Sequence, residues 1–223
     1  MIKRFIFLLG YLYFSSPIFS QLPPGFSYVK DIAPTIATDL RYLGSTNFVG
    51  MKIDGYEEDV LITSTATAKA LKNVQSELLK KGFSLKVFDA YRPQQAVNHF
   101  VRWARVVDDT LMKRVYYPNV EKKNLFKLGY IASKSGHSRG SSVDVTIIDF
   151  VTKQDLDMGS PFDFFGEISH ISNENLTAQQ IENRSLLQKV MQKYGFRPYK
   201  NEWWHFTLRK EPFPNTYFDF KIK

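Results

Sequence analysis

Two segments of the chain, 64–81 and 94–107, carry apolar residues at helical spacing, and a third segment has the start and stop signals of a helix. Ser64 has the side chain of a helix N-cap, and Gly82 stands where that helix would end. Thr177 and Gln180 form the sequence pattern of a capping box, and Gly195 closes the segment that follows. These patterns predict helices over 64–81, 94–107 and 177–194.

Three shorter segments are typical of strands. They are rich in β-branched and aromatic residues, or alternate between apolar and polar positions, and they cover 83–88, 142–149 and 203–208. The predicted helices cluster and several strands are short. We therefore expect an α+β fold, with a mostly antiparallel sheet flanked by helices, rather than a doubly wound parallel sheet.

The N-terminus has the pattern of a secretory signal peptide. Lys3 and Arg4 precede an apolar stretch, Phe5–Phe14, that is too short to span a bilayer, and small residues follow it up to Ser20. We expect a signal peptide over 1–20 and one domain over 21–223, because no repeat or linker composition interrupts the rest. The mature protein is then expected in the bacterial periplasm or secreted, without stable insertion in the membrane.

Composition narrows the possible chemistry. The 223 residues include no cysteine, which excludes disulfide scaffolds, thiolate metal sites and a cysteine nucleophile. A metal would have to be held by carboxylates and by the four histidines. The net charge of +8 is spread over short basic pairs, so we expect a solvated basic surface and no nucleic-acid partner.

The segment Ser135–Asp144 is the first candidate site. His137 precedes a turn rich in Gly and Ser, and Asp144 then interrupts an apolar strand, where a carboxylate is costly to bury without a partner. The turn allows His137 to fold back beside Asp144, which gives a nitrogen and an oxygen ligand suited to zinc. A hairpin with a surface histidine and an edge aspartate is the alternative.

Glu202 and His205 form the second candidate, and Arg92 the third. A histidine on a metal with a nearby glutamate as base is the pairing of zinc hydrolases, but three residues along an ideal strand point to opposite faces. Both can face one site only if Glu202 lies in the preceding turn or a bulge intervenes.

Arg92 directly follows a predicted strand and has the chemistry to bind an oxyanion. An aromatic core strand and a surface arginine are the simpler interpretations. His99, in a predicted helix, and His170, in a polar segment and expected at the surface, are not expected to belong to a site.

Several segments taken together resemble the zinc D-alanyl-D-alanine dipeptidases, within the broader D,D-peptidase group. The segments that carry this resemblance run through most of the chain: 39–42, 47–48, 89–93, 132–144, 158–163, 202–205 and 211–220. The resemblance implies the α+β fold shared with D,D-carboxypeptidases and the Hedgehog signalling domain. It also implies a D-amino-acid dipeptide as substrate.

The resemblance assigns roles residue by residue. It implies one zinc ion bound by His137, Asp144 and His205. It implies that Glu202 is the catalytic base and that Arg92 stabilises the transition state. It further implies that the substrate is held by Tyr42, Asp163 and Ser135.

Two motif positions depart from the family pattern. Ser142 stands where alanine is usual, and Gly136 stands where the dipeptidases carry a second serine. The signal peptide would bring the enzyme to dipeptides released from the cell wall. A periplasmic D,D-carboxypeptidase that trims peptidoglycan peptides, a non-catalytic zinc-bearing binding module and a wall-polymer-binding protein remain as alternatives, and the sequence leaves the oligomeric state open.

Overall fold

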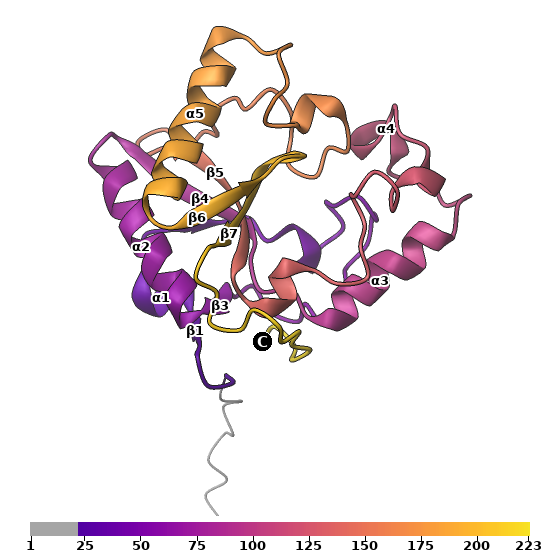
Figure 1. Cartoon of the computed structure of the whole chain (residues 1–223), viewed down its shortest axis with the longest axis horizontal. Coiled ribbons are helices and arrows are strands. Elements are labelled where there is room, and N and C mark those ends of the chain that lie inside the picture. Colours follow the sequence, from indigo (N-terminus) through magenta and orange to yellow (C-terminus); the bar gives the residue numbers. More distant parts are fainter. Residues whose placement is uncertain (1–21) are drawn as a thin grey trace, which may run out of the picture.

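A five-stranded sheet runs through the centre of the molecule in the order β2–β4–β5–β7–β6 (Figure 1). The structure is a computed structural model that describes residues 22–223, so the predicted signal peptide lies outside the described residues. The strands, including the separate antiparallel pair β1–β3, are β1 Phe26–Tyr28, β2 Ala37–Thr38, β3 Ile62–Ser64, β4 Phe83–Asp89, β5 Ser142–Asp149, β6 Phe196–Tyr199 and β7 Glu202–Leu208. Within the large sheet, β2–β4 is parallel and the other pairs are antiparallel. The predicted α+β class with a mostly antiparallel sheet is confirmed.

Helices flank the sheet. They are α1 Val29–Ile32, α2 Thr65–Leu79, α3 Gln94–Arg105, α4 Lys113–Tyr116 and α5 Ala178–Lys193. Figure 1 shows α2 and α5 together on one side, packed on the strands, while α3 and α4 lie on the other side. Short 3-10 turns occupy 41–43, 122–124, 136–139 and 167–169.

The caps that the sequence predicts set the starts of α2 and α5. The Ser64 side chain accepts a hydrogen bond from the backbone N–H of Thr67. At the start of α5, Thr177 accepts from the Gln180 N–H and the Gln180 side chain accepts from the Thr177 N–H, so the capping box is formed in both directions.

Two predicted helix ends are too late. The first predicted helix ends at Leu79 rather than Lys81, and the second ends at Arg105 rather than Val107. Val107 matched the helical spacing, but its side chain is exposed and so gains nothing from continuing the helix toward the core.

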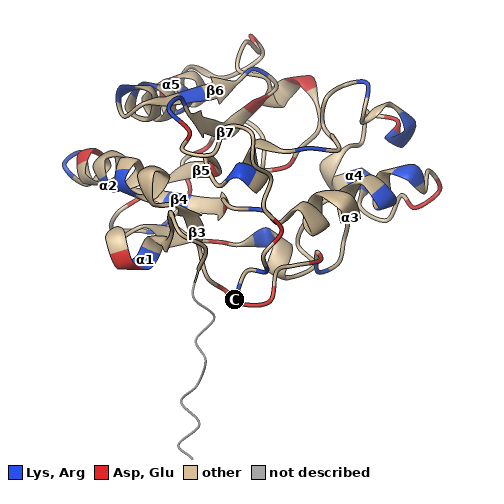
Figure 2. Cartoon of the chain, turned by 60° about the horizontal axis from the view of Figure 1, so that its bottom comes forward, with Lys and Arg blue, Asp and Glu red and all other residues tan. Residues whose placement is uncertain are grey.

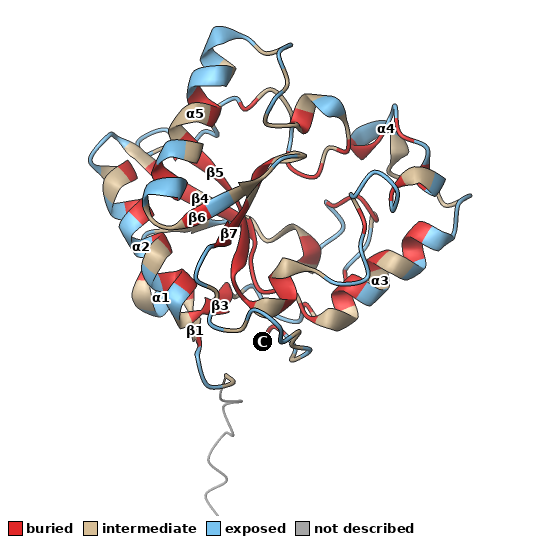
Figure 3. Ribbon diagram, in the orientation of Figure 1, coloured by how far each residue is buried: buried red, intermediate tan, exposed pale blue. Residues whose placement is uncertain are grey.

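The central strand β5 is buried on both faces. Apolar and polar residues alternate along it, yet every position from Ser142 to Ile148 is buried (Figure 3). Helices α2 and α5 cover one face, and on the other face Asp144 lines the cavity described below. Polar residues buried in this way require specific partners.

The surface charge is dispersed. Lys and Arg lie on helices on both sides of the sheet and are interleaved with Asp and Glu (Figure 2). Within residues 22–223, no helix combines the length and the apolar character that crossing a bilayer requires.

Candidate active site

Three neighbouring strands place a row of polar side chains across the sheet. Asp89 of β4 is the register partner of Asp144 of β5, and Asp144 is in turn the partner of His205 of β7. Register partners on adjacent strands lie about 5 Å apart. Residues from distant parts of the sequence are thus adjacent because the strands pair in this register.

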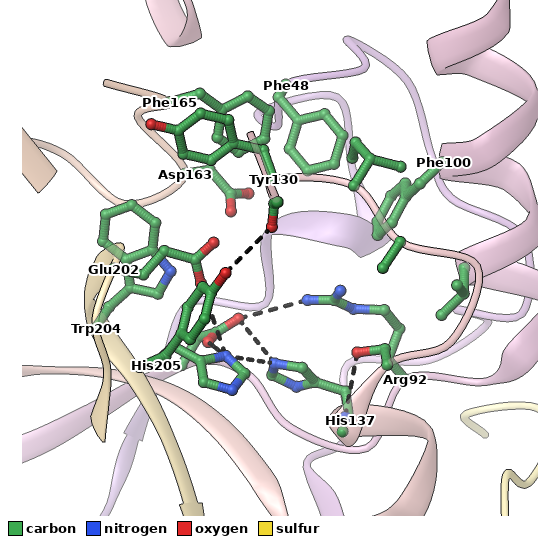
Figure 4. A pocket seen from close by; sticks show the side chains of 18 of the residues that line it. Phe48, Arg92, Phe100, Tyr130, His137, Asp163, Phe165, Glu202, Trp204 and His205 are labelled. Atoms are coloured by element: carbon green, nitrogen blue, oxygen red, sulfur yellow. Dashed lines mark hydrogen bonds and ion pairs between the residues drawn. The ribbon is translucent and has the colours of Figure 1, made fainter. Parts of the chain in front are cut away.

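An irregularity in the β6–β7 pair brings Glu202 to the same cavity as His205. Pro198 pairs with Phe206, but the next residue of β6, Tyr199, pairs with Glu202. One step along β6 therefore spans four residues of β7, and the regular alternation of faces is broken. Both side chains line one cavity (Figure 4). A bulge was one of the two arrangements that would allow Glu202 and His205 to face the same site.

His137 enters the site from a 3-10 turn, Gly136–Arg139. The Ser135 hydroxyl accepts a hydrogen bond from the His137 N–H at 3.2 Å, and Gly140 ends the turn with a φ of 74° that favours glycine. The Nδ1 atom of His137 donates to the carbonyl oxygen of Ala90 at 2.7 Å. Because that bond fixes the proton on Nδ1, Nε2 carries the lone pair that faces the cavity.

His137, Asp144 and His205 form a compact set of ligand atoms. His137 Nε2 lies 3.2 Å from His205 Nδ1 and 3.4 Å from Asp144 Oδ2, and His205 Nδ1 lies 3.0 Å from Asp144 Oδ1. A tetrahedral zinc ion with bonds of about 2.0–2.1 Å separates its ligands by about 3.3 Å. Two imidazole nitrogens and a carboxylate group at these spacings fit a catalytic zinc site with one open position.

Neighbouring groups keep Asp144 deprotonated, which is the form that binds a metal. Burial alone would raise the pKa of this carboxyl group, but His137 and His205 beside it outweigh burial and hold its pKa below the usual range. The group is therefore an anion at neutral pH, as a metal ligand must be.

Arg92 is held over the cluster by two aspartates. Its Nε and an Nη atom each lie 2.9 Å from Asp89 Oδ2, and the Nη atom lies 3.4 Å from Asp144 Oδ2. Asp89 also accepts a 2.6 Å hydrogen bond from the hydroxyl of Tyr56. The guanidinium is thereby fixed with one edge toward the cavity (Figure 4).

Glu202 lies next to the three ligand residues, but its carboxylate is farther from His205 than the other ligand atoms are. Its Oε2 is 3.8 Å from His205 Nδ1. Burial, together with the negative charge of Asp144, raises the pKa of Glu202 to about 8 in the metal-free protein. A carboxyl group with a pKa near neutrality is suited to accept and return a proton.

Tyr42 and Asp163 meet on the opposite wall. The Tyr42 hydroxyl donates a 2.8 Å hydrogen bond to Asp163 Oδ2, and both residues are buried. Asp163 has a φ of 61°, a strained backbone conformation for a residue other than glycine. No basic side chain of residues 22–223 forms an ion pair with Asp163, and burial raises the pKa of its carboxyl group. A cationic ligand would supply the missing charge.

The cavity is small and its far wall is aromatic. Its volume is about 280 Å³, at the low end for ligand sites. The structure brings every site residue named from the sequence to its lining: Tyr42, Arg92, Ser135, His137, Asp144, Asp163, Glu202 and His205. The aromatic side chains of Phe48 and Phe165 close the wall near Asp163, and the ring of Phe100 packs against the Arg92 guanidinium (Figure 4).

Sequence reasoning missed the supporting residues Asp89 and Tyr56. Asp89 belongs to the same short motif as Arg92. A carboxylate three residues before an arginine was the sequence signal that could have indicated its role. His99 lies away from the cavity and pairs with Asp54, as expected. His170 is half-buried rather than on the surface, because its ring contacts the hydroxyl of Tyr130.

The fold and the cluster define an α+β protein with a site of the kind that metallohydrolases use. Comparison with known proteins makes this specific, because the family model described as D-ala-D-ala dipeptidase (Peptidase_M15) matches residues 24–223. The chain belongs to this family of metallopeptidases, and the prediction of such an enzyme is confirmed.

Curated relatives agree along nearly their whole length. The chain is 39% identical to a D-alanyl-D-alanine dipeptidase of Enterococcus faecium over 89% of this chain and 98% of the relative. It is 40% identical to one of Enterococcus faecalis, with the same coverage. It is 38% identical to one of Streptomyces coelicolor, over 88% of this chain and 98% of the relative.

Solved structures with more distant similarity include two peptidases. One is a variant of the vancomycin-resistance D,D-pentapeptidase VanY in complex with Zn(II), with a TM-score of 0.41, 13% identity and coverage of 69% of this chain and 76% of that chain. The other is the LD-carboxypeptidase LdcB, with a TM-score of 0.39, 19% identity and coverage of 86% and 72%. The family assignment rests on the family model and the curated relatives.

Proposed function

We propose that this protein hydrolyses the dipeptide D-Ala-D-Ala in a zinc-dependent reaction. One observation carries the proposal: the cavity that contains the His137–Asp144–His205 cluster also contains Asp163, a buried carboxylate with no basic partner among the described residues. In a free dipeptide, the residue that supplies the scissile carbonyl group also carries a free ammonium group. The names of the curated relatives support the same substrate.

His137, Asp144 and His205 are the proposed ligands of a single zinc ion. When bound, zinc polarises the scissile carbonyl group and lowers the pKa of its water to about 7. The two imidazoles are neutral donors, so Asp144 supplies the one negative charge in the ligand set.

Glu202 is the proposed general base and then general acid. Its carboxylate takes a proton from the attacking water and delivers it to the nitrogen of the leaving D-alanine as the peptide bond breaks. Its position beside His205 supports this role, because the carboxylate is close to the cluster without belonging to the three atoms that best match a metal. A positive metal charge nearby would lower the pKa of Glu202 from its metal-free value and favour the base form.

Arg92 is the proposed donor to the developing oxyanion. Its side chain is fixed by Asp89, so no ordering is needed during the reaction. Preorganised donors of this kind are worth about 3–4 kcal/mol of barrier.

Asp163 and Tyr42 are the proposed ammonium site. An ionised Asp163 pairs with the substrate cation, and the Tyr42 hydroxyl holds the carboxylate in place. Ser135, which shapes the His137 turn, also lines the cavity and is proposed to contact the substrate. A peptidoglycan stem peptide offers an amide at this position, which would leave Asp163 buried without a counter-charge.

Export is a separate part of the proposal. The basic, apolar and small-residue segments within residues 1–20 support a cleaved signal peptide and a periplasmic or secreted enzyme. There it would act on dipeptides released from the cell wall. Cell fractionation with N-terminal sequencing tests this: a chain beginning near residue 21 outside the cytoplasm is expected, and an intact N-terminus in the cytoplasm would contradict it.

The substrate assignment is tested with three compounds. The zinc-loaded protein should release D-alanine from D-Ala-D-Ala, and treatment with EDTA should abolish the release. N-acetyl-D-Ala-D-Ala, which has no ammonium group, and a stem pentapeptide ending in D-Ala-D-Ala should be cleaved at least about 100-fold less efficiently. Efficient cleavage of the pentapeptide would instead assign a D,D-carboxypeptidase, and cleavage of none would contradict the hydrolase.

A further inference from the structure

A pair of buried hydroxyl groups lies directly behind the proposed metal ligand His205. Thr207 Oγ1 lies 3.4 Å from His205 Nε2 and 2.7 Å from Ser142 Oγ. Ser142 is fully buried and Thr207 is 7% exposed. The mechanism above uses neither residue.

The strand register explains this arrangement. Ser142 and Thr207 are register partners on β5 and β7, and the pair Asp144 and His205 lies two residues farther along the same strands. Residues two apart on a strand share a face. The hydroxyl pair is therefore the next rung of the same ladder as the Asp144–His205 pair.

Metal binding through Nδ1 sets which partner donates between His205 and Thr207. His205 Nδ1 faces Asp144 and His137, so it must carry the lone pair, and the ring proton must then be on Nε2. Nε2–H donates to Thr207 Oγ1, and the Thr207 hydroxyl can in turn donate to Ser142 Oγ. If Ser142 offered no acceptor, the Thr207 hydroxyl would be free to donate to Nε2 and favour the tautomer that cannot bind through Nδ1.

We propose that Ser142 and Thr207 are positioning residues that hold His205 in its metal-binding tautomer and orientation. This inference rests on the proposed metal site, and it assigns a role to two residues that do not touch the substrate. Hydrogen bonds to the second nitrogen of a metal-binding histidine commonly set its tautomer, and their loss costs about 10–100-fold in metal affinity.

Gly136 belongs to the same arrangement. A Cβ atom at position 136 would overlap Ser142 Oγ, the hydroxyl that accepts from Thr207. Positions 136 and 142 therefore share one volume, which holds one side-chain group. A serine at position 136 would require a smaller residue at position 142.

Zinc affinity of the whole protein, measured by competition with a chromophoric chelator, tests the role of the hydroxyls. Thr207→Val keeps the shape but removes the hydroxyl, and Thr207→Ser keeps the hydroxyl. We expect the zinc affinity to fall about 10–100-fold in Thr207→Val and less than about threefold in Thr207→Ser. Equal zinc affinity in Thr207→Val and the wild type would overturn the proposal.

Two further readouts separate positioning from a general loss of packing. The melting temperature of the metal-free protein should differ little between Thr207→Val and Thr207→Ser. With four histidines in the chain, nitrogen NMR of the zinc-loaded protein can report the Nε2–H proton of His205 directly. The metal-free protein is unsuitable because His205 Nδ1 then faces the Asp144 carboxylate, which holds the ring proton on Nδ1. An Nε2–H signal protected from exchange with water is expected in the zinc-loaded wild type, and a faster-exchanging signal in Ser142→Ala. An equally protected signal in Ser142→Ala would overturn the role of Ser142 even if Thr207→Val failed to fold.

The coupling to Gly136 is tested by a double substitution. Gly136→Ser alone should lower both the melting temperature and the zinc affinity, because the new side chain displaces Ser142. Adding Ser142→Ala should restore the melting temperature but not the zinc affinity, and a double variant no more stable than the single one would contradict the shared volume. These readouts do not depend on hydrolysis: if the protein binds zinc as described but cleaves no dipeptide, the proposed function fails and this inference stands.

Discussion

Arg92 and Asp89 are joined through a single carboxylate oxygen, which lies 2.9 Å from both Nε and an Nη atom of the arginine. The same oxygen is 3.3 Å from Nδ1 of His137. One buried side chain therefore orients both the proposed oxyanion donor and a proposed metal ligand.

Substitution of Asp89 should impair catalysis without removing a group that touches the substrate. In Asp89→Asn we expect kcat to fall about 10–100-fold and zinc affinity to weaken, because an amide cannot pair fully with Arg92. Tyr56→Phe removes one hydrogen bond to Asp89 and should cost about 1 kcal/mol of stability with a smaller effect on kcat. Asp155→Asn, at a side chain that pairs with Lys86 far from the cavity, is the matched control. A kcat for Asp89→Asn within twofold of wild type would contradict this role.

Substitutions at the ammonium site should act mainly on KM. Asp163→Asn removes the charge that pairs with the dipeptide, so KM for D-Ala-D-Ala should rise about 10–100-fold. Tyr42→Phe removes one hydrogen bond to that carboxylate and should raise KM about fivefold. Steady-state kinetics measure both, with the exposed Asp59→Asn as control. If Asp163→Asn left KM unchanged, the dipeptide would have to bind elsewhere.

The buried Glu202 should make the metal-free protein less stable as pH rises. Its pKa is about 8 in the folded chain and near 4.5 when unfolded, so between these values the folded state binds the extra proton. The stabilisation is complete below about pH 4.5 and is lost as pH rises through about 8. Buried Asp163, whose pKa is also raised, contributes with the same sign. Urea denaturation of the EDTA-treated protein at pH 5 to 9 measures the slope, which should be shallower in Glu202→Gln. An equal slope would show that Glu202 does not titrate in this window.

Local signals in the sequence predicted the elements well. The caps at Ser64 and Thr177 depend on residues within one turn, and β5 has the predicted bounds 142–149. The residues of the cavity could be named because the family motifs keep their types and order. Features with local causes, and side chains within family motifs, could therefore be predicted from the sequence alone.

The relationships between strands could not be predicted in the same way. The residues next to Asp89, Asp144 and His205 in the sequence do not indicate that β4, β5 and β7 are neighbours in that register. The supporting roles of Tyr56 and Thr207 follow from this register and from packing between distant segments. The long connection between α3 and β5 contains only short helical turns. Such short elements produce no hydrophobic periodicity from which they could be predicted.

The most direct test of the account is the turnover of D-Ala-D-Ala by zinc-loaded Glu202→Gln, with the zinc content of each sample measured. The exposed Glu182→Gln on α5 is the matched control. The account predicts that Glu202→Gln retains one zinc ion per chain while kcat falls at least about 100-fold, because no group remains to move the proton. Wild-type turnover in a fully zinc-loaded Glu202→Gln protein would contradict the proposed mechanism.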